Sequence, residues 1–249
     1  MGHFARRAIV TDGIIFQLDP NNSLGQYKNI ANPTEVVSPI NGLSIVDGAY
    51  VFDGVDNRMD FVKDQFIVGD IDYSFEFWFS YDSGHGSGQA NLFYYGKSTV
   101  NYYPKALFIY LSTFGGGSVG MTIHNDVDDN SGVVGAASSI AANIPEFILG
   151  GASGTFEDTF HHYVAVFDSV NNLILFYLDG ALLHSVEAAN GFSPSVGAFG
   201  DGVLRIGSNS SGSTGNNEGK LGLFNIYQNK ALDATEVLKN YEATKHRFI

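Results

Sequence analysis

The stretch YSFEFWFS, residues 73–80, decides the fold class of this 249-residue chain. Its side chains alternate in character, and the two faces of an extended strand would hold different sets. One face holds Tyr73, Phe75, Phe77 and Phe79, and the other holds Ser74, Glu76, Trp78 and Ser80. Such alternation predicts a β-strand with its aromatic face in an apolar core.

Eleven further short segments carry strand patterns. They are residues 13–18, 49–52, 59–62, 92–95, 106–111, 119–124, 161–168, 173–178, 181–186, 204–207 and 220–227. The dipeptide Asp179-Gly180 predicts a tight hairpin, and the turn at residues 53–57 predicts a second hairpin between 49–52 and 59–62. Residues 21–48 show no sustained period and predict a long surface connection with at most one weak strand.

One short helix closes the chain. Asp233 is a good N-cap with Glu236 three residues later, and Val237, Leu238 and Tyr241 form an apolar stripe at helical spacing. About a dozen strands and a single helix predict an all-β, two-sheet antiparallel sandwich. We expect one domain over residues 11–249, preceded by an N-terminal arm, residues 1–10.

Composition and charge exclude several classes of partner. The net charge is -13, with +2 at residues 1–10, +2 at residues 220–249 and -17 between them. Nucleic acids and anionic membranes both attract basic surfaces, so neither is expected as a partner.

The chain has no cysteine, no apolar secretion signal near residue 1 and no long apolar run. Synthesis in a cytoplasm is therefore expected.

Six strings, taken in order, resemble the conserved strings of laminin-G-like domains of the concanavalin A-like lectin/glucanase fold. They are residues 9–19, 52–57, the strand around Trp78, and residues 161–166, 176–180 and 226–232. The resemblance implies a jelly-roll sandwich. It departs from the family pattern at Leu223, where the last strand usually carries an acidic residue.

The ending, residues 236–248, is similar to versions of this domain that are common in tailed bacteriophage virion proteins. That similarity implies a non-enzymatic structural protein at the virion surface, a head decoration or fibre component made in the host cytoplasm. Its partners would be capsid or fibre subunits, or further copies of itself. The alternative is a carbohydrate-binding receptor or adhesion module that binds a host-surface glycan.

The sequence argues against a glycosidase. Retaining enzymes need two carboxyl groups about 5 Å apart, and Glu76 is the only carboxylate on its strand. His161 and His162 are adjacent on a strand and so point to opposite faces, which prevents both from binding one metal ion. Histidines satisfied by hydrogen bonds at the strand end are the favoured interpretation.

Two loops could bind Ca²⁺, and no other cofactor is expected. Asp126, Asp128 and Asn130 place oxygen ligands at alternate positions, as a calcium loop does, although a solvated acidic loop is the favoured alternative. The turn at residues 53–57, with Asp53, Asp56 and Asn57, is equally consistent with plain turn chemistry.

Aromatic and basic residues give two further candidate sites. Tyr94, Tyr95, Tyr102 and Tyr103 could stack on a sugar ring, although core packing is favoured, as it is for Trp78. The first and last strands of this fold generally lie close together. Arg6, Arg7, Lys239, Lys245 and Arg247 are therefore expected to form one basic patch that binds an acidic partner surface.

Overall fold

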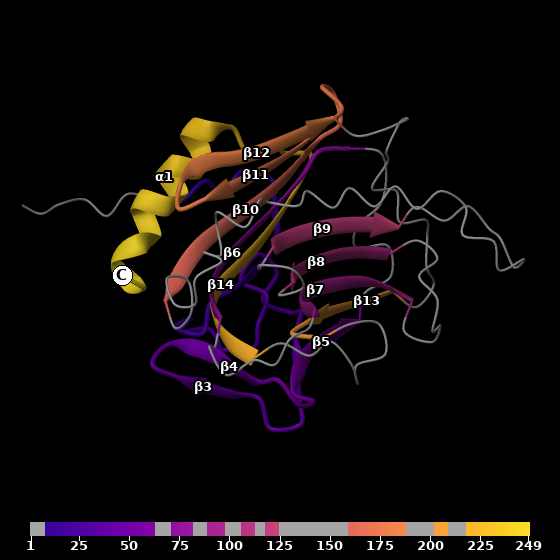
Figure 1. Ribbon diagram of the computed structural model, residues 1–249. Helices are drawn as coiled ribbons and strands as arrows, with labels where there is room; N and C mark the ends of the chain where they lie inside the picture. Colours follow the sequence, from indigo (N-terminus) through magenta and orange to yellow (C-terminus); the bar gives the residue numbers. More distant parts are fainter. Residues whose placement is uncertain are drawn as a thin grey trace, which may run out of the picture.

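Two β-sheets and one helix make up the computed structural model, which describes residues 8–62, 71–81, 89–97, 106–112, 118–124, 159–187, 202–208 and 218–249. The sheets are antiparallel and lie face to face (Figure 1). This arrangement confirms the all-β sandwich with one short C-terminal helix. Within the described part of the chain, no helix is long and apolar enough to cross a bilayer.

The larger sheet has eight strands. They are β1 (Ile14–Leu18), β3 (Ser44–Val46), β4 (Ala49–Asp53), β6 (Tyr73–Tyr81), β10 (Phe160–Asp168), β11 (Leu173–Leu178), β12 (Ala181–Glu187) and β14 (Glu218–Gln228). Their order is β12-β11-β10-β6-β14-β4-β3, and β1 also pairs with β14.

The smaller sheet has six strands. They are β2 (Ser38–Ile40), β5 (Arg58–Val62), β7 (Gln89–Lys97), β8 (Ala106–Ser112), β9 (Ser118–His124) and β13 (Gly202–Ile206). Their order is β2-β5-β13-β7-β8-β9. All twelve segments with strand patterns in the sequence form strands.

The core lies between the two sheets, and the aromatic face of β6 lines it. Phe75 packs against Phe93 of β7 with ring centroids 5.2 Å apart, and Phe93 packs against Phe224 of β14 at 5.6 Å. All three side chains are at most 2% exposed. Burial of each large apolar side chain contributes about 1.5–3 kcal/mol, so this aromatic layer holds the sandwich together.

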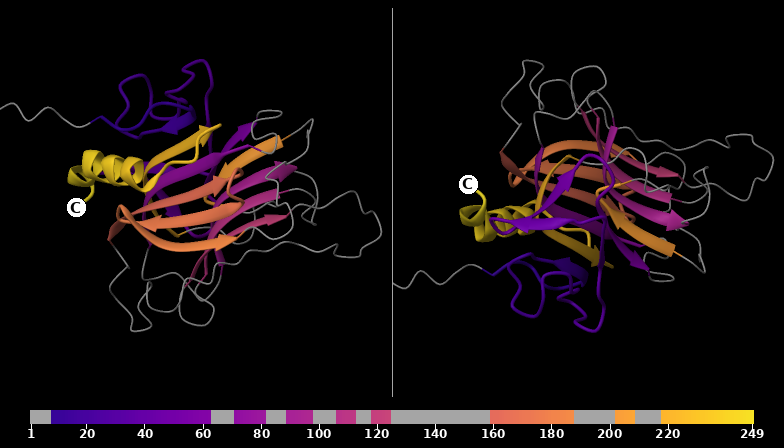
Figure 2. Two further views of the ribbon diagram at one scale, coloured as in Figure 1. Left: turned by 90° about the horizontal axis from the view of Figure 1, so that it is seen from above. Right: turned by 90° about the horizontal axis from the view of Figure 1, so that it is seen from below.

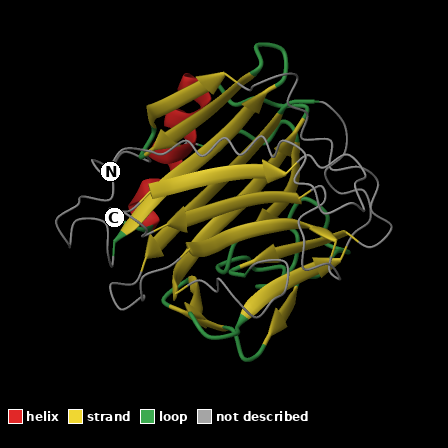
Figure 3. Ribbon diagram, turned by 45° about the vertical axis from the view of Figure 1, so that its right-hand side comes forward, coloured by secondary structure: helices red, strands yellow, loops and turns green. Residues whose placement is uncertain are grey.

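Both faces of β6 are buried. Its aromatic face lies in the core, while its other face lies under the helix α1 (Ala234–Thr244), which packs against the outer face of the eight-stranded sheet (Figure 3). The predicted cap is confirmed: Asp233 Oδ1 accepts from the Glu236 amide at 2.9 Å, and Glu236 Oε2 accepts from the Asp233 amide at 3.1 Å. A short 3-10 helix, η1 (Lys245–Arg247), follows α1.

The buried face of α1 differs from the expected stripe. Val237, Asn240 and Thr244 are buried, whereas Leu238 is 48% exposed. The helix is therefore rotated toward its polar residues. Apolar periodicity alone missed this because Asn240 and Thr244 have hydrogen-bond partners in the sheet.

One predicted hairpin is wrong and the other is confirmed. β4 and β5 lie in different sheets. β4 pairs with β3 and β14, so the chain crosses from the eight-stranded to the six-stranded sheet after the turn at residues 53–57. In that turn Asp53 Oδ1 accepts from the Val55 amide at 2.9 Å. β11 and β12 do form a hairpin, with Asp179 (φ 49°) and Gly180 (φ 81°) in the left-handed region that a two-residue turn requires.

Residues 21–48 contain two short strands, β2 and β3, where at most one was expected. This segment is held to β1 by the fully buried Asn29. Its Oδ1 accepts from the amides of Gln17 and Ala31 at 2.9 and 3.1 Å, and its Nδ2 donates to Ile15 O at 3.1 Å and Glu35 Oε2 at 2.7 Å.

Candidate functional site

A sandwich of two sheets offers two outer faces to a ligand, and α1 covers a central part of one of them. The covered part belongs to the eight-stranded sheet and carries the second set of β6 side chains, including Glu76 and Trp78. Both side chains are fully buried.

Glu76 accepts four hydrogen bonds from three structural elements. Its Oε1 accepts from His162 Nε2 of β10 at 2.8 Å. Its Oε2 accepts from Asn225 Nδ2 and Tyr227 OH of β14 at 2.9 and 2.7 Å, and from Asn240 Nδ2 of α1 at 3.1 Å. All five residues have no exposed surface. We call these five residues the Glu76 network.

The Glu76 network is built for an ionised carboxylate. Burial alone would raise the pKa of Glu76, but the hydrogen bond from His162, with those from Asn225 and Tyr227, holds that pKa below its ordinary value. Burial and the charge of Glu76 together raise the pKa of Tyr227, which keeps its hydroxyl as a donor. A carboxylate enclosed in this way has no access to a substrate.

The network also joins the two ends of the described chain. Asn240 Oδ1 accepts from the Val10 amide at 2.7 Å, and Val10 packs with Val237 and Leu232 in a small apolar cluster. Val10, the last residue of the expected N-terminal arm, therefore packs against α1.

Trp78 is a packing anchor, as expected. Its Nε1 donates to Thr244 Oγ1 at 2.9 Å, and its ring stacks on Phe248 with centroids 4.7 Å apart. Phe248 also packs on Phe160 at 5.1 Å. A Cβ atom at Gly222 would lie 2.1 Å from Phe248 Cε1, so the missing side chain of this glycine makes room for the phenylalanine ring.

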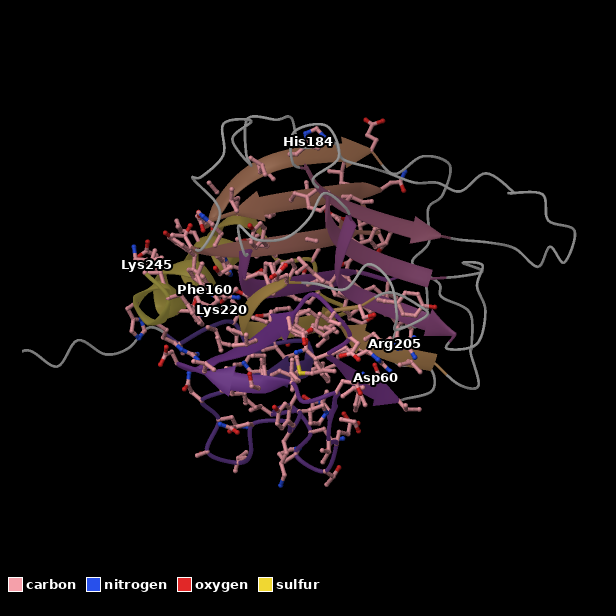
Figure 4. The ribbon with its side chains drawn as sticks, turned by 60° about the horizontal axis from the view of Figure 1, so that its bottom comes forward. Asp60, Phe160, His184, Arg205, Lys220 and Lys245 are labelled. Carbon is pink, nitrogen blue, oxygen red and sulfur yellow. The ribbon has the colours of Figure 1, made fainter. Side chains whose placement is uncertain are left out.

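The outer face of the six-stranded sheet carries a charged cluster, Arg58, Asp60 and Arg205. Asp60 Oδ1 accepts from the Nε atoms of Arg58 and Arg205, each at 3.2 Å. Asp60 and Arg205 are labelled in Figure 4 and lie close together there. Met59 and Phe61 alternate with these residues of β5 and lie in the core, which places Asp60 on the outer face. We call Arg58, Asp60 and Arg205 the outer-face cluster.

Tyr94 lies next to this cluster, because Arg205 of β13 is paired with Asp60 on one side and with Tyr94 of β7 on the other. Tyr94 is 2% exposed. Tyr95 is 1% exposed and packs in the core between the sheets, which supports the core interpretation for that residue. Tyr102 and Tyr103 lie outside the described residues.

The proposed basic patch is only partly within the described residues, which exclude Arg6 and Arg7. Lys239 is exposed on α1. Lys245 pairs with Glu242 at 2.7 Å, and Arg247 makes two bonds to Asp19, at 2.7 and 2.8 Å. Nearby acids therefore offset part of this positive charge, and binding of a partner here stays a prediction.

The adjacent histidines have separate partners, as the favoured interpretation predicts. His161 Nδ1 lies 2.8 Å from Asp179 Oδ2, whereas His162 belongs to the Glu76 network. Burial alone would raise the pKa of Asp179, but the bonds from His161 and from the His162 amide hold that pKa below its ordinary value.

Within the described residues, no three His, Cys, Asp or Glu side chains are grouped as metal ligands. Asp53 accepts two backbone amides of its own turn, and Asn57 Oδ1 accepts the Asp53 amide at 3.0 Å, which is plain turn chemistry. Asp126, Asp128 and Asn130 lie outside the described residues, so that calcium loop stays a prediction.

Local sequence patterns do not reveal the outer-face cluster. Its only local signal is the alternation of charged and apolar side chains in Arg58-Met59-Asp60-Phe61, which marks a strand with a polar outer face. The third member, Arg205, lies 145 residues away from Asp60.

Comparison with solved structures finds the same sandwich in several proteins. A mutant of HCR/D matches with a TM-score of 0.66 and 12% identity over 94% of this chain and 53% of that one. Domain 4 of AbnA, a GH43 extracellular arabinanase from Geobacillus stearothermophilus in complex with arabinotriose, matches with a TM-score of 0.59 and 16% identity over 92% of this chain and 98% of that one. Ruminococcus gnavus IT-sialidase CBM40 matches with a TM-score of 0.51 and 13% identity over 68% of this chain and 82% of that one.

These likenesses show the fold. The chain spans about half of the HCR/D chain, so that protein's own activity is not transferred to it. A comparison with curated protein sequences found no significant match. The laminin-G-like family model described as the concanavalin A-like lectin/glucanases superfamily matches residues 53–238. Because this match covers more than half of the sequence, the chain belongs to the concanavalin A-like lectin/glucanases superfamily.

Proposed function

We propose that this protein is a non-catalytic carbohydrate-binding module. The observation that carries the proposal is the family match over residues 53–238, joined to the likeness with an arabinanase domain solved in complex with arabinotriose. That likeness covers 98% of the domain and 92% of this chain, so it extends over one whole domain of similar size. This supports carbohydrate binding better than the virion role that the chain's ending suggests.

The sandwich favours binding over hydrolysis. Glycosidases use two carboxyl groups on either side of the scissile bond. Glu76 of β6 and Asp60 of β5 each have hydrogen-bond partners that include no second carboxyl group. Glu76 is also fully buried, which removes it from any substrate.

We place the binding surface at the outer-face cluster. α1 covers the matching part of the eight-stranded sheet, whereas Arg58, Asp60 and Arg205 lie on the outer face of the other sheet. Their side chains are 17%, 16% and 9% exposed, so a ligand would reach the edges of these charged groups. Sugar hydroxyl groups form hydrogen bonds with such charged groups, each contributing about 1.5–3 kcal/mol.

A glycan array followed by calorimetry tests the proposal, with arabinotriose as the first soluble probe. We expect selective binding to at least one glycan class. Arg205→Ala should then weaken that binding about tenfold or more, because it removes one charged hydrogen-bonding group. Lys239→Ala, an exposed cation on α1, is the matched control and should leave binding unchanged.

Two outcomes would count against this proposal in different ways. A protein that is folded by circular dichroism yet binds nothing on the array would refute carbohydrate binding. Binding that survives Arg205→Ala and Arg58→Ala would leave the function in place but refute the outer-face cluster as its site.

The virion location remains an untested expectation. It depends on residues 236–248, and the structure gives this string a clear packing role as most of α1, η1 and the Phe248 anchor. None of the comparisons supports a virion protein. Immunodetection of the protein in purified particles would test that location independently of glycan binding.

A further inference from the structure

The region that covers the eight-stranded sheet is a separate packing unit. We call residues 232–249, which contain α1, η1 and Phe248, the strap. The strap lies on the outer side of β10, β11 and β12, away from the six-stranded sheet, in both views of Figure 2. Its apolar contacts form a small cluster of their own, with Leu232 and Val237 from the strap, Val164 and Val166 from β10, and Val10 from the N-terminal segment.

Polar contacts also connect the strap to the sheet. Asn240 bonds to Glu76 and to the Val10 amide, and Thr244 accepts from Trp78. Local unfolding generally follows such separate cooperative units. The sandwich core contains none of these strap residues, so loss of the strap would leave that core intact.

Every group that contacts the Glu76 carboxylate donates a hydrogen bond to it. His162 comes from β10, Asn225 and Tyr227 from β14, and Asn240 from α1. No lysine or arginine is among these contacts. Protonation of Glu76 would turn one of its oxygens into an O–H donor that faces other donors. A carboxylic acid also accepts fewer hydrogen bonds than a carboxylate, so at least one of the four bonds would break.

Two other titratable groups near the network come from α1 and from the turn between β11 and β12. Tyr241 of α1 packs on His162 with ring centroids 5.8 Å apart, and Asp179, at the turn between β11 and β12, accepts from the His162 amide at 2.9 Å. In the described residues His162 Nδ1 is buried without a hydrogen-bond partner, so Nε2 carries the proton that Glu76 accepts.

From this geometry we infer that the strap is released by acid. Ionised Glu76 holds the strap and Val10 on the sheet, and protonation of Glu76 detaches them while the sandwich stays folded. The hydrogen bonds hold the pKa of Glu76 below its ordinary value of 4.5. The stabilisation is therefore complete above pH 4.5 and is lost as the pH falls through the lower pKa of the folded state.

The protein contains its own reporter for this release. Trp78 is the only tryptophan and is fully buried. Three of its partners, Thr244, Tyr241 and Phe248, belong to the strap, and its ring also packs on His162 of β10. Release would expose the indole ring and shift its fluorescence to the red. Circular dichroism of the strands would report the sandwich separately.

The experiment is a pH titration from 7 to 2.5 of the full chain and three variants. In wild type we expect the Trp78 shift at a higher pH than the loss of strand signal. Hydrogen exchange should show that the protection of the α1 amides falls up to tenfold for each pH unit of acidification. The reason is that Glu76 binds one proton when the strap opens. Glu76→Gln, which cannot ionise, should remove this pH dependence. Asp47→Asn, which neutralises an exposed acid in the turn between β3 and β4, is the matched control and should keep it.

Asn240→Leu decides the matter if Glu76→Gln fails to fold. It removes the bonds from α1 to Glu76 and Val10 at similar volume, so the α1 amides should lose protection already at pH 7. Three results would overturn the inference: a wild-type Trp78 shift that coincides with loss of the strands, an unchanged pH dependence in Glu76→Gln, or full α1 protection in Asn240→Leu.

Discussion

Substitution of Gly222 by alanine tests the Phe248 anchor. The added Cβ would lie 2.1 Å from Phe248 Cε1 and 2.6 Å from Cζ, which is far inside contact distance. Gly222 does not occupy the left-handed region, so alanine fits its backbone without strain. Phe248 must therefore leave its position between Trp78 and Phe160.

The expected loss follows from the two ring contacts. An aromatic pair contributes about 0.5–1.5 kcal/mol beyond burial, so the loss of the pairs with Trp78 and Phe160 costs about 1–3 kcal/mol. Replacing glycine by alanine stabilises by about 0.4–1 kcal/mol through the unfolded chain. Gly222→Ala should therefore lower the free energy of unfolding by up to about 2.6 kcal/mol, with about 1.3 kcal/mol at the middle of the two ranges.

A double-mutant cycle in urea, followed by Trp78 fluorescence, measures this coupling. In a Phe248→Ala background the clash is absent, so Gly222→Ala should be neutral or slightly stabilising. An equal loss in both backgrounds would refute the reasoning, because it would show that the added methyl group disturbs the strand itself.

Two other predictions concern single residues, and a third concerns a loop. Asn29→Ala should lower the free energy of unfolding by about 2–4 kcal/mol, since four buried hydrogen bonds are lost, and a urea titration would measure it. Asp233→Ala removes the cap of α1 and should cost about 1 kcal/mol, seen as faster hydrogen exchange in the first turn of the helix. If the loop at residues 126–130 binds Ca²⁺, the melting temperature should rise with the logarithm of free Ca²⁺, and a melting curve that a chelator leaves unchanged would contradict that site.

Local patterns in the sequence were enough for the strands and the helix cap. The alternation in residues 73–80 and the spacing of Asp233 and Glu236 depend on neighbours within four positions, which the sequence displays directly. The wrong hairpin shows the limit of such reasoning. β4, residues 49–53, pairs with β14, which lies about 170 residues later in the sequence. No local signal shows that β14 occupies the edge of β4 where β5 was expected to pair.

The sequence could not predict the Glu76 network for the same reason. In the sequence Glu76 stands out only as a carboxylate without a catalytic partner. Its hydrogen-bond partners lie 86 to 164 residues away, so no local pattern connects them to it. A lone buried acid in a strand needs donors from other elements. The Asn and Tyr on the last strand, at alternate positions 225 and 227, were the available signal.

The strap and the outer-face cluster lie on opposite outer sides of the sandwich, which makes the two proposals separable. Two packed sheets stand about 10 Å apart, and the aromatic layer between them is close-packed and rigid. A ligand on the six-stranded sheet gains no differential contact from the state of the strap, and without such a difference it cannot shift that equilibrium. Asn240→Leu should therefore bind glycan with wild-type affinity at pH 7, measured by calorimetry. A weaker or tighter affinity in this variant would show that strap release deforms the sandwich, and by reciprocity the glycan would then alter the pH at which the strap opens.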